Sequence, residues 1–208
     1  MNPPWGGHGF NTSVGDAVNI AWKIAAVEQG WGQPGLLASY ECERRGVVEQ
    51  TVASAADNMR SLAGDLAADA AAIQRAKRPE FYSLGLVLGY TYAGSPVIQP
   101  GDGGPTHVRC YVPSAEPGRR LPHAWLPDGT SLFDRIGRGF TLVGAAGERA
   151  AALAARADER GIPLSLCEPP SDYPWRDDYL LVRPDQHIAW RATDPACIDL
   201  DIVTGRKG

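Results

Sequence analysis

Hydrophobic residues in the first third of the chain recur with the spacing of helices. Between residues 13 and 28 they occur on several faces at i, i+3 and i+4, which predicts a mostly buried helix. Residues 36–75 repeat that spacing with few strand-forming side chains, so a second helical region is expected there. We expect Gly46 to interrupt it, because glycine weakens a helix interior. The first helix has three polar candidates for its N-terminal cap, which are Asn11, Thr12 and Ser13.

The remaining two thirds of the chain alternate between short apolar runs and connections. Residues 81–92 combine aromatic and β-branched side chains, which favours one or two strands, and residues 94–105 read as a turn-rich linker. A strand, a helix closed by Gly161 and a second strand follow, an order that predicts a parallel pair with a crossover helix. These are expected at 140–143, 148–160 and 163–167, ahead of a hairpin formed by 179–183 and 187–191. Residues 198–203 alternate as a strand does.

These elements predict a mixed fold of class α/β (α+β). A chain of 208 residues can bury one substantial core or two small ones, and we expect two unequal units. Residues 1–105 form a mostly helical unit, and residues 106–208 form a unit of strands and helices around a small sheet. The glycine- and proline-rich segment that ends near residue 105 marks the boundary.

Composition excludes several classes of function. The formal net charge is −4 and the basic residues are dispersed, so neither nucleic acid nor an anionic membrane surface is an expected partner. No run approaches the roughly 20 apolar residues of a membrane span, and no secretory signal is recognisable, so we expect a cytoplasmic protein. Four cysteines lie far apart, without the spacing of a redox or zinc site, and no metal is expected: Cys42, Cys110, Cys167 and Cys197.

A proline- and glycine-rich loop leads into the first helix and reads Pro3-Pro4-Trp5-Gly6-Gly7-His8-Gly9-Phe10-Asn11-Thr12. A helix N-terminus presents backbone N–H groups without intrahelical partners, together with the positive end of the helix dipole, to an electron-rich group. Glycines let the backbone approach such a group closely. Taken alone, a loop of this kind is more often an ordinary helix entry than a binding site.

Motifs in this loop and beyond it, in consistent order, resemble the FAD-dependent aromatic-ring hydroxylases, the single-component flavoprotein monooxygenases similar to para-hydroxybenzoate, phenol and polyketide hydroxylases. The resemblance covers nearly the whole chain. It is carried by the loop, by Gly15-Asp16-Ala17-Val18-Asn19-Ile20-Ala21-Trp22-Lys23, by Tyr40-Glu41-Cys42-Glu43-Arg44-Arg45, by residues 84–96 and 117–126, and by Leu181-Val182-Arg183-Pro184-Asp185. The resemblance implies that the second unit is thioredoxin-like, without redox cysteines.

The resemblance also implies a cofactor and its contacts. FAD is expected, with NAD(P)H as electron donor and an aromatic or polyketide molecule as substrate. The amides of Phe10 and Asn11 would stabilise negative charge on the reduced flavin, and the Pro4 carbonyl would face the substrate side. Three glycines would let the loop approach the isoalloxazine: Gly6, Gly7 and Gly9. No residue is assigned a catalytic role.

A complete member of this family carries a strand, a Gly-x-Gly-x-x-Gly turn and a helix that bind the ADP half of FAD, and the sequence contains no such unit. We therefore expect the C-terminal portion of a hydroxylase, a truncated product or one half of a split enzyme, that is not competent alone. A separate FAD-binding chain or a second copy is the expected partner. The alternative is a non-catalytic interaction or dimerisation module.

Several conspicuous side chains also have an ordinary structural interpretation. His8 is expected to be solvated or structural, and His123 to pack beside Trp125. Trp5 and Trp22 are expected in the core. The charged run Glu41, Glu43, Arg44 and Arg45 predicts a solvated helix face. By resemblance, that run would instead tie the helix to an FAD-binding domain, and it would be exposed without one.

Overall fold

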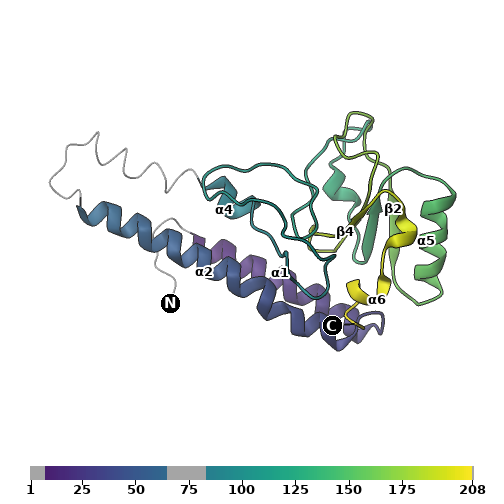
Figure 1. Ribbon diagram of the computed structural model, residues 1–208, viewed down its shortest axis with the longest axis horizontal. Coiled ribbons are helices and arrows are strands. Elements are labelled where there is room, and N and C mark those ends of the chain that lie inside the picture. The colour runs from purple at the N-terminus through teal and green to yellow at the C-terminus, as the bar shows by residue number, and fades with distance from the viewer. Residues whose placement is uncertain (1–7, 65–82, 208) are drawn as a thin grey trace.

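Two long helices lie side by side and form one end of the molecule (Figure 1). The computed structural model describes residues 8–64 and 83–207, in which helix α1 spans His8–Glu28 and helix α2 spans Pro34–Gly64. The predicted interruption at Gly46 is wrong, because α2 continues through it. A glycine costs only about 1 kcal/mol relative to alanine in a helix interior, which a 31-residue helix tolerates. The part of the predicted helical region beyond residue 64 lies outside the described residues.

The predicted capping of the first helix is also wrong. The helix begins at His8, so Asn11, Thr12 and Ser13 lie within it. The Thr12 hydroxyl donates to the His8 carbonyl at 2.8 Å and the Ser13 hydroxyl donates to the Gly9 carbonyl at 3.1 Å. Each hydroxyl thus bonds one turn back along the helix, as serine and threonine do in helix interiors, and caps no amide.

A four-stranded sheet forms the other end of the chain, in the order β2-β1-β3-β4. Its strands are β1 (Phe140–Val143), β2 (Leu164–Cys167), β3 (Tyr179–Val182) and β4 (Ile188–Ala192). β1 and β2 pair in parallel across helix α5 (Glu148–Asp158), and β3 and β4 form an antiparallel hairpin, which confirms both predictions. Every residue of β1 and β3 is buried, as their continuous apolar runs require at the centre of a sheet.

Two predicted strands are helical instead. Residues 84–88 form helix α4 (Leu84–Leu88), and within the described part of this segment, residues 83–92, the extended pairing is a bridge between Thr91 and Arg119. Near the C-terminus a 3₁₀ turn, η2 (Pro195–Cys197), precedes helix α6 (Leu200–Val203). The Asp199 carboxylate caps α6 by accepting from the amides of Asp201 at 2.9 Å and Ile202 at 3.3 Å. A further 3₁₀ turn, η1 (Leu132–Arg135), lies between α4 and the sheet in sequence.

A cluster of three aromatic rings joins the helices to the sheet. Trp22 of α1 and Trp31 of the α1–α2 turn stack with centroids 6.2 Å apart, and both contact the edge of Phe140 in β1. The C-terminal segment packs against the same turn, where the Gln33 amide donates to the Thr204 carbonyl at 2.9 Å. Trp22 is thus a core residue, as predicted, whereas Trp5 lies outside the described residues. The division of the chain at residues 105 and 106 stays a prediction.

Within residues 8–64 and 83–207, no helix has the combined length and hydropathy that crossing a bilayer requires.

Candidate functional site

The first turn of α1 carries the described part of the predicted flavin site. Gly9, Phe10 and Asn11 are the second, third and fourth residues of α1. The Phe10 side chain is 79% exposed, so this side of the helix start is open. Pro4, Gly6 and Gly7, the other predicted contacts, lie outside the described residues, and the roles of all six residues stay predictions.

A small cavity lies beside this turn. Its volume is about 70 Å³, and its lining includes His8, Asn11 and Thr12 of α1 together with Arg44 of α2. That volume corresponds to about two water molecules at roughly 30 Å³ each, so the cavity does not accommodate three fused rings. A flavin ring contacting the Phe10 and Asn11 amides would therefore lie on the open side of the helix start.

Arg44 of α2 bonds to the second and third turns of α1. Its Nε donates to Asp16 Oδ1 at 2.7 Å, and its Nη2 donates to the Thr12 carbonyl at 3.2 Å. Its Nη1 donates to the Tyr92 hydroxyl at 2.9 Å. Burial alone would lower the pKa of Arg44, but the bonds and charges around Tyr92 and Asp16 outweigh it and raise the pKa. Arg44 is therefore a permanent cation beneath the predicted flavin-facing turn.

Four charged side chains are buried where the helices meet the sheet. We call Lys23, Glu43, Arg183 and Asp185 the ion cluster. Arg183 donates to both Glu43 oxygens, at 2.7 and 2.9 Å, and to both Asp185 oxygens, at 3.0 and 2.5 Å. Lys23 Nζ donates to Glu43 at 2.8 Å. Two positive and two negative charges balance, which is the condition under which buried ions are tolerated.

Neutral polar groups complete the hydrogen bonding of the ion cluster. Asn19 donates to Glu43 at 2.8 Å and to Asp185 at 3.1 Å. The Ser95 hydroxyl donates to Glu43 at 2.7 Å, and the Ser39 hydroxyl accepts from Lys23 at 2.7 Å. Glu43 therefore accepts from α1, from residue 95 and from the segment after β3, and it connects three parts of the chain.

The pKa values in the ion cluster follow from burial and charge together. Burial alone would raise the pKa of Glu43, but Arg183 and then Lys23 outweigh it and hold the pKa at about 2. Burial and the charge of Arg183 lower the pKa of Lys23 to about 8, against the opposing effect of Glu43. Burial opposes the ionisation of Asp185 too, yet Arg183 and His187 keep its pKa well below the usual range.

The prediction that the charged run at residues 41–45 forms a solvated helix face is wrong for two of its four charged residues. Glu41 and Arg45 are exposed and pair with each other, but Glu43 and Arg44 are 2% and 3% exposed. Glu43 bonds to Arg183 and Arg44 bonds to α1, both within this chain, so the expected exposure of these two residues is wrong, whereas attachment of the run to an FAD-binding domain stays a prediction.

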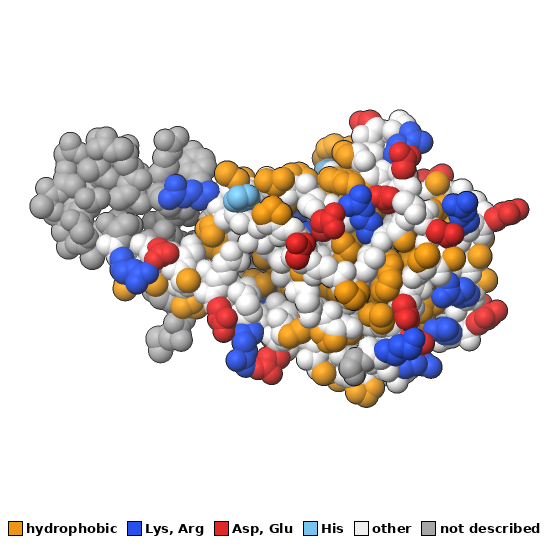
Figure 2. Space-filling model, in the orientation of Figure 1, with side chains coloured by type: hydrophobic (Ala, Val, Ile, Leu, Met, Phe, Trp, Pro, Cys, Tyr) orange, Lys and Arg blue, Asp and Glu red, His pale blue; other side chains and the backbone are white. Residues whose placement is uncertain are grey.

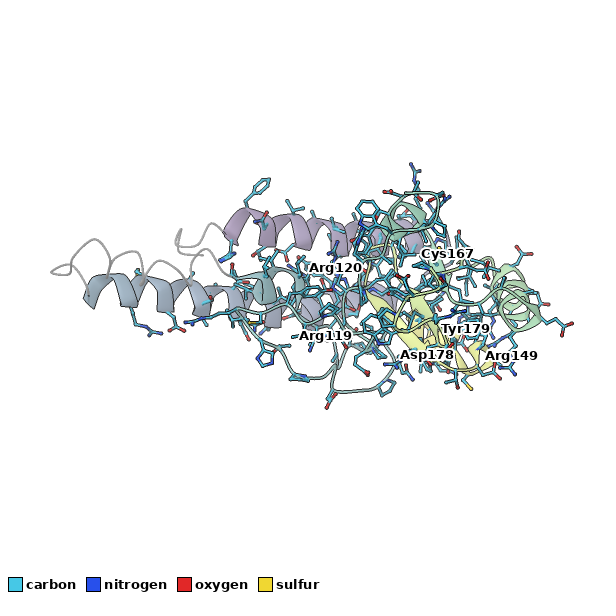
Figure 3. The ribbon with its side chains drawn as sticks, turned by 90° about the horizontal axis from the view of Figure 1, so that it is seen from above. Arg119, Arg120, Arg149, Cys167, Asp178 and Tyr179 are labelled. Atoms are coloured by element: carbon cyan, nitrogen blue, oxygen red, sulfur yellow. The ribbon has the colours of Figure 1, made fainter. Side chains whose placement is uncertain are left out.

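Arg119 fastens the segment after α4 to the sheet, in the region between them in Figure 3. Its guanidinium donates to the carbonyls of Gly103 at 2.6 Å, Gly104 at 2.8 Å and Pro105 at 2.6 Å, and also to that of Gly89. A positive charge thus gathers four backbone carbonyls that belong to no helix or strand. Sequence reasoning missed this role and those of Lys23, Arg183 and Asp185.

His8 and His123, the two histidines considered in the sequence analysis, differ in their exposure. His8 is 7% exposed and starts α1. The exposed His123 contacts the Trp125 ring at a centroid distance of 4.9 Å and the Phe133 ring at 5.4 Å, which confirms that it packs beside Trp125. No group of three or more histidine, cysteine, aspartate or glutamate side chains within the described ranges is arranged to hold a metal ion.

The outward face of α1 is mostly apolar from Phe10 to Ile24, and the exposed Glu28 lies beyond it at the end of the helix. Phe10, Val14, Val18 and Ile24 are exposed by 79%, 45%, 48% and 48%. The inward face of the same helix carries the charged Lys23, so the usual polarity of a surface helix is reversed. By contrast, charged side chains gather over α5 on the face shown in Figure 2, where a helix meets solvent in the ordinary way.

Two family descriptions match the chain. Residues 1–55 match the family described as "FAD binding domain", and residues 114–204 match "Aromatic-ring hydroxylase, C-terminal". FAD-dependent monooxygenase apdD of Emericella nidulans is 34% identical over 90% of this chain and 35% of its own length. A putative polyketide hydroxylase of Streptomyces halstedii is 32% identical over 92% of this chain and 39% of its own length.

Solved structures of flavin-dependent enzymes are also similar to this chain. The rebeccamycin biosynthetic enzyme RebC with reduced flavin is 34% identical, with a TM-score of 0.82 over 99% of this chain and 43% of its own. Aklavinone-11 hydroxylase with FAD and aklavinone is 30% identical, with a TM-score of 0.74 over all of this chain and 41% of its own. The chain therefore spans 35 to 43% of the length of these relatives. It belongs to the FAD-dependent aromatic-ring hydroxylases and corresponds to a portion of them that includes their C-terminal domain.

Proposed function

We propose that this chain supplies the flavin-facing helix start and the C-terminal part of an FAD- and NAD(P)H-dependent hydroxylase of aromatic or polyketide substrates. The observation that carries the proposal is the first turn of α1, which contains Gly9, Phe10 and Asn11 and in which Phe10 is 79% exposed. Bound FAD would supply the redox and oxygen chemistry. The chain's own amides would hold the electron-rich edge of the ring, as fixed donors that need little reorganisation.

The partner in this proposal is an FAD-binding half, supplied by the same polypeptide or by another. The chain covers 35 to 43% of its relatives, so more than half of their length has no counterpart in it. The exposed apolar face of α1 begins at the residues expected to meet the flavin and continues from Phe10 to Ile24. A contiguous apolar face of this kind marks a contact surface.

A reconstitution experiment tests the proposal. The chain is mixed with the FAD-binding half of a relative, and FAD retention, sedimentation and substrate-dependent NAD(P)H oxidation are measured. We expect FAD to be retained and NAD(P)H to be oxidised only by the mixture, with weak FAD uptake by the isolated chain. A mixture that neither associates nor retains FAD would contradict the proposal.

A matched pair of variants locates the contact. Val18→Asp places a charge on the outward face of α1, whereas Ala151→Asp places the same charge on the exposed side of α5. Association should weaken at least tenfold for Val18→Asp and stay unchanged for Ala151→Asp, because only the first buries an unpaired carboxylate at the contact. Light scattering of the isolated chain tests the alternative that it is a dimerisation module. Self-association that is present in wild type and lost in Val18→Asp would support that alternative.

A further inference from the structure

One guanidinium contacts two turns of α1 and a distant tyrosine at the same time. The Arg44 side chain is 4% exposed, and its three donors reach Asp16, the Thr12 carbonyl and the Tyr92 hydroxyl. It also lies over the rings of Tyr90 and Tyr92, at 5.5 and 5.9 Å from their centroids. A planar group with five fixed donors can satisfy such separated acceptors, whereas an ammonium cannot.

The sequence leaves room for this contact at one position of α1. A Cβ added to Gly15 would lie 3.0 Å from Arg44 Nη2, closer than ordinary van der Waals contact. Glycine costs about 1 kcal/mol of helix stability relative to alanine, and here it gives the guanidinium access to the helix backbone. The Thr12 carbonyl has a second lone pair available for Arg44 in addition to its helical bond.

We propose that Arg44 is a positioning residue, which fixes the first turn of α1 and thereby the Phe10 and Asn11 amides that would contact flavin. The flavin part of this role rests on the proposed function, but the mechanical part does not. Thr12 lies one residue beyond Asn11, and Asp16 lies one turn further on. The guanidinium would therefore act on the flavin-facing donors through the backbone of the helix.

Hydrogen exchange in the isolated chain tests the mechanical part. In Arg44→Met the amides of residues 12–15 should exchange at least tenfold faster, with a smaller change elsewhere in α1 and α2. Arg45→Met is the matched control, because Arg45 is the next residue of the same helix and its side chain is 65% exposed. Equal exchange in Arg44→Met and wild type, or loosening spread evenly over both helices, would overturn the proposal.

Two further variants keep the test informative if Arg44→Met fails to fold. Arg44→Lys should recover most of the melting temperature but not the protection of residues 12–15, since one ammonium cannot reach all three acceptors. Gly15→Ala should raise intrinsic helix propensity and yet speed exchange at the same amides, because it displaces the guanidinium. Protection that instead increases in Gly15→Ala, or full protection in Arg44→Lys, would refute the positioning role.

A flavin measurement separates this inference from the proposed function. In the reconstituted flavoprotein, Arg44→Lys should make the midpoint potential of the flavin more negative, and Arg45→Met should not, because poorly placed amides stabilise the reduced anion less. An unchanged potential in Arg44→Lys would remove the flavin part of the role. Failure of reconstitution itself would count against the proposed function, and the exchange experiment would still decide on Arg44.

Discussion

Replacing Glu43 by glutamine tests whether the ion cluster stabilises the fold. The substitution preserves shape, so it creates no cavity, and it removes one negative charge from the balanced set. Lys23 and Arg183 then face Asp185 alone, and a net positive charge is left buried. Breaking a buried ion pair by removing one partner costs about 3–5 kcal/mol.

The pKa of Glu43 gives an independent magnitude. Its lowering from 4.5 to about 2 corresponds to roughly 3 kcal/mol, at about 1.36 kcal/mol per pH unit. The two values agree, so we expect the free energy of unfolding to fall by about 3–4 kcal/mol near pH 7. For a chain of this length that lowers the melting temperature by about 6–16 °C.

Urea unfolding followed by circular dichroism is the assay, and pH provides its signature. Because the folded pKa lies below the unfolded one, this stabilisation is complete above about pH 4.5 and decreases as pH falls toward 2. The difference between wild type and Glu43→Gln should therefore shrink from pH 5 to pH 3. Glu41→Gln is the control, two residues away and 69% exposed at its side chain, and should cost less than about 1 kcal/mol. A loss below about 1 kcal/mol in Glu43→Gln, or a difference independent of pH, would refute the reasoning.

Two further predictions concern the same helices. Lys23 has a folded pKa of about 8 against an ordinary 10.5, so the unfolded chain binds more protons between these values. The free energy of unfolding of wild type should accordingly rise with pH in that window relative to that of Lys23→Met, and a difference between the two proteins that does not change with pH would contradict this. Gly35→Ala should destabilise by about 1–3 kcal/mol, because its Cβ would lie 2.3 Å from the Gly205 carbonyl oxygen. Gly46→Ala, with open space around its Cβ, should instead raise the melting temperature, and equal effects of the two substitutions would show that the Gly205 contact is unimportant.

The sequence predicts the secondary structure correctly where the residues that determine it are close together in the chain. The β1–α5–β2 unit and the β3–β4 hairpin follow from apolar runs and turn residues within a few positions of one another. Residues 84–88 were assigned wrongly because a short apolar run fits either a strand or a helix until its packing is known. At residues 198–203 the decisive feature was the Asp199 cap, a helix start signal that the alternating pattern concealed.

For the candidate site, the sequence predicts the residues at the start of α1 but not the buried charged residues behind them. The loop motif indicated residues 9–11, and the structure places them at the start of a helix. The burial of Glu43 could not be predicted from its neighbours, since its partner Arg183 lies 140 positions away and a charged run has the same spacing in either environment. The polarity of α1 contains a sequence signal for this burial. Asn19 and Lys23 lie four residues apart on its buried side, whereas Val14 and Val18 lie four residues apart on its exposed side.

The ion cluster also restricts how genes of this kind can recombine. Its positive and negative members are contributed by segments near the start and near the end of the chain, which a crossover between two relatives would separate. A hybrid that inherits Lys23 and Glu43 from one parent and only one of Arg183 and Asp185 from the other would carry an unbalanced charge in the interior. Exchange of whole C-terminal modules should therefore succeed only among parents that share both halves of this arrangement.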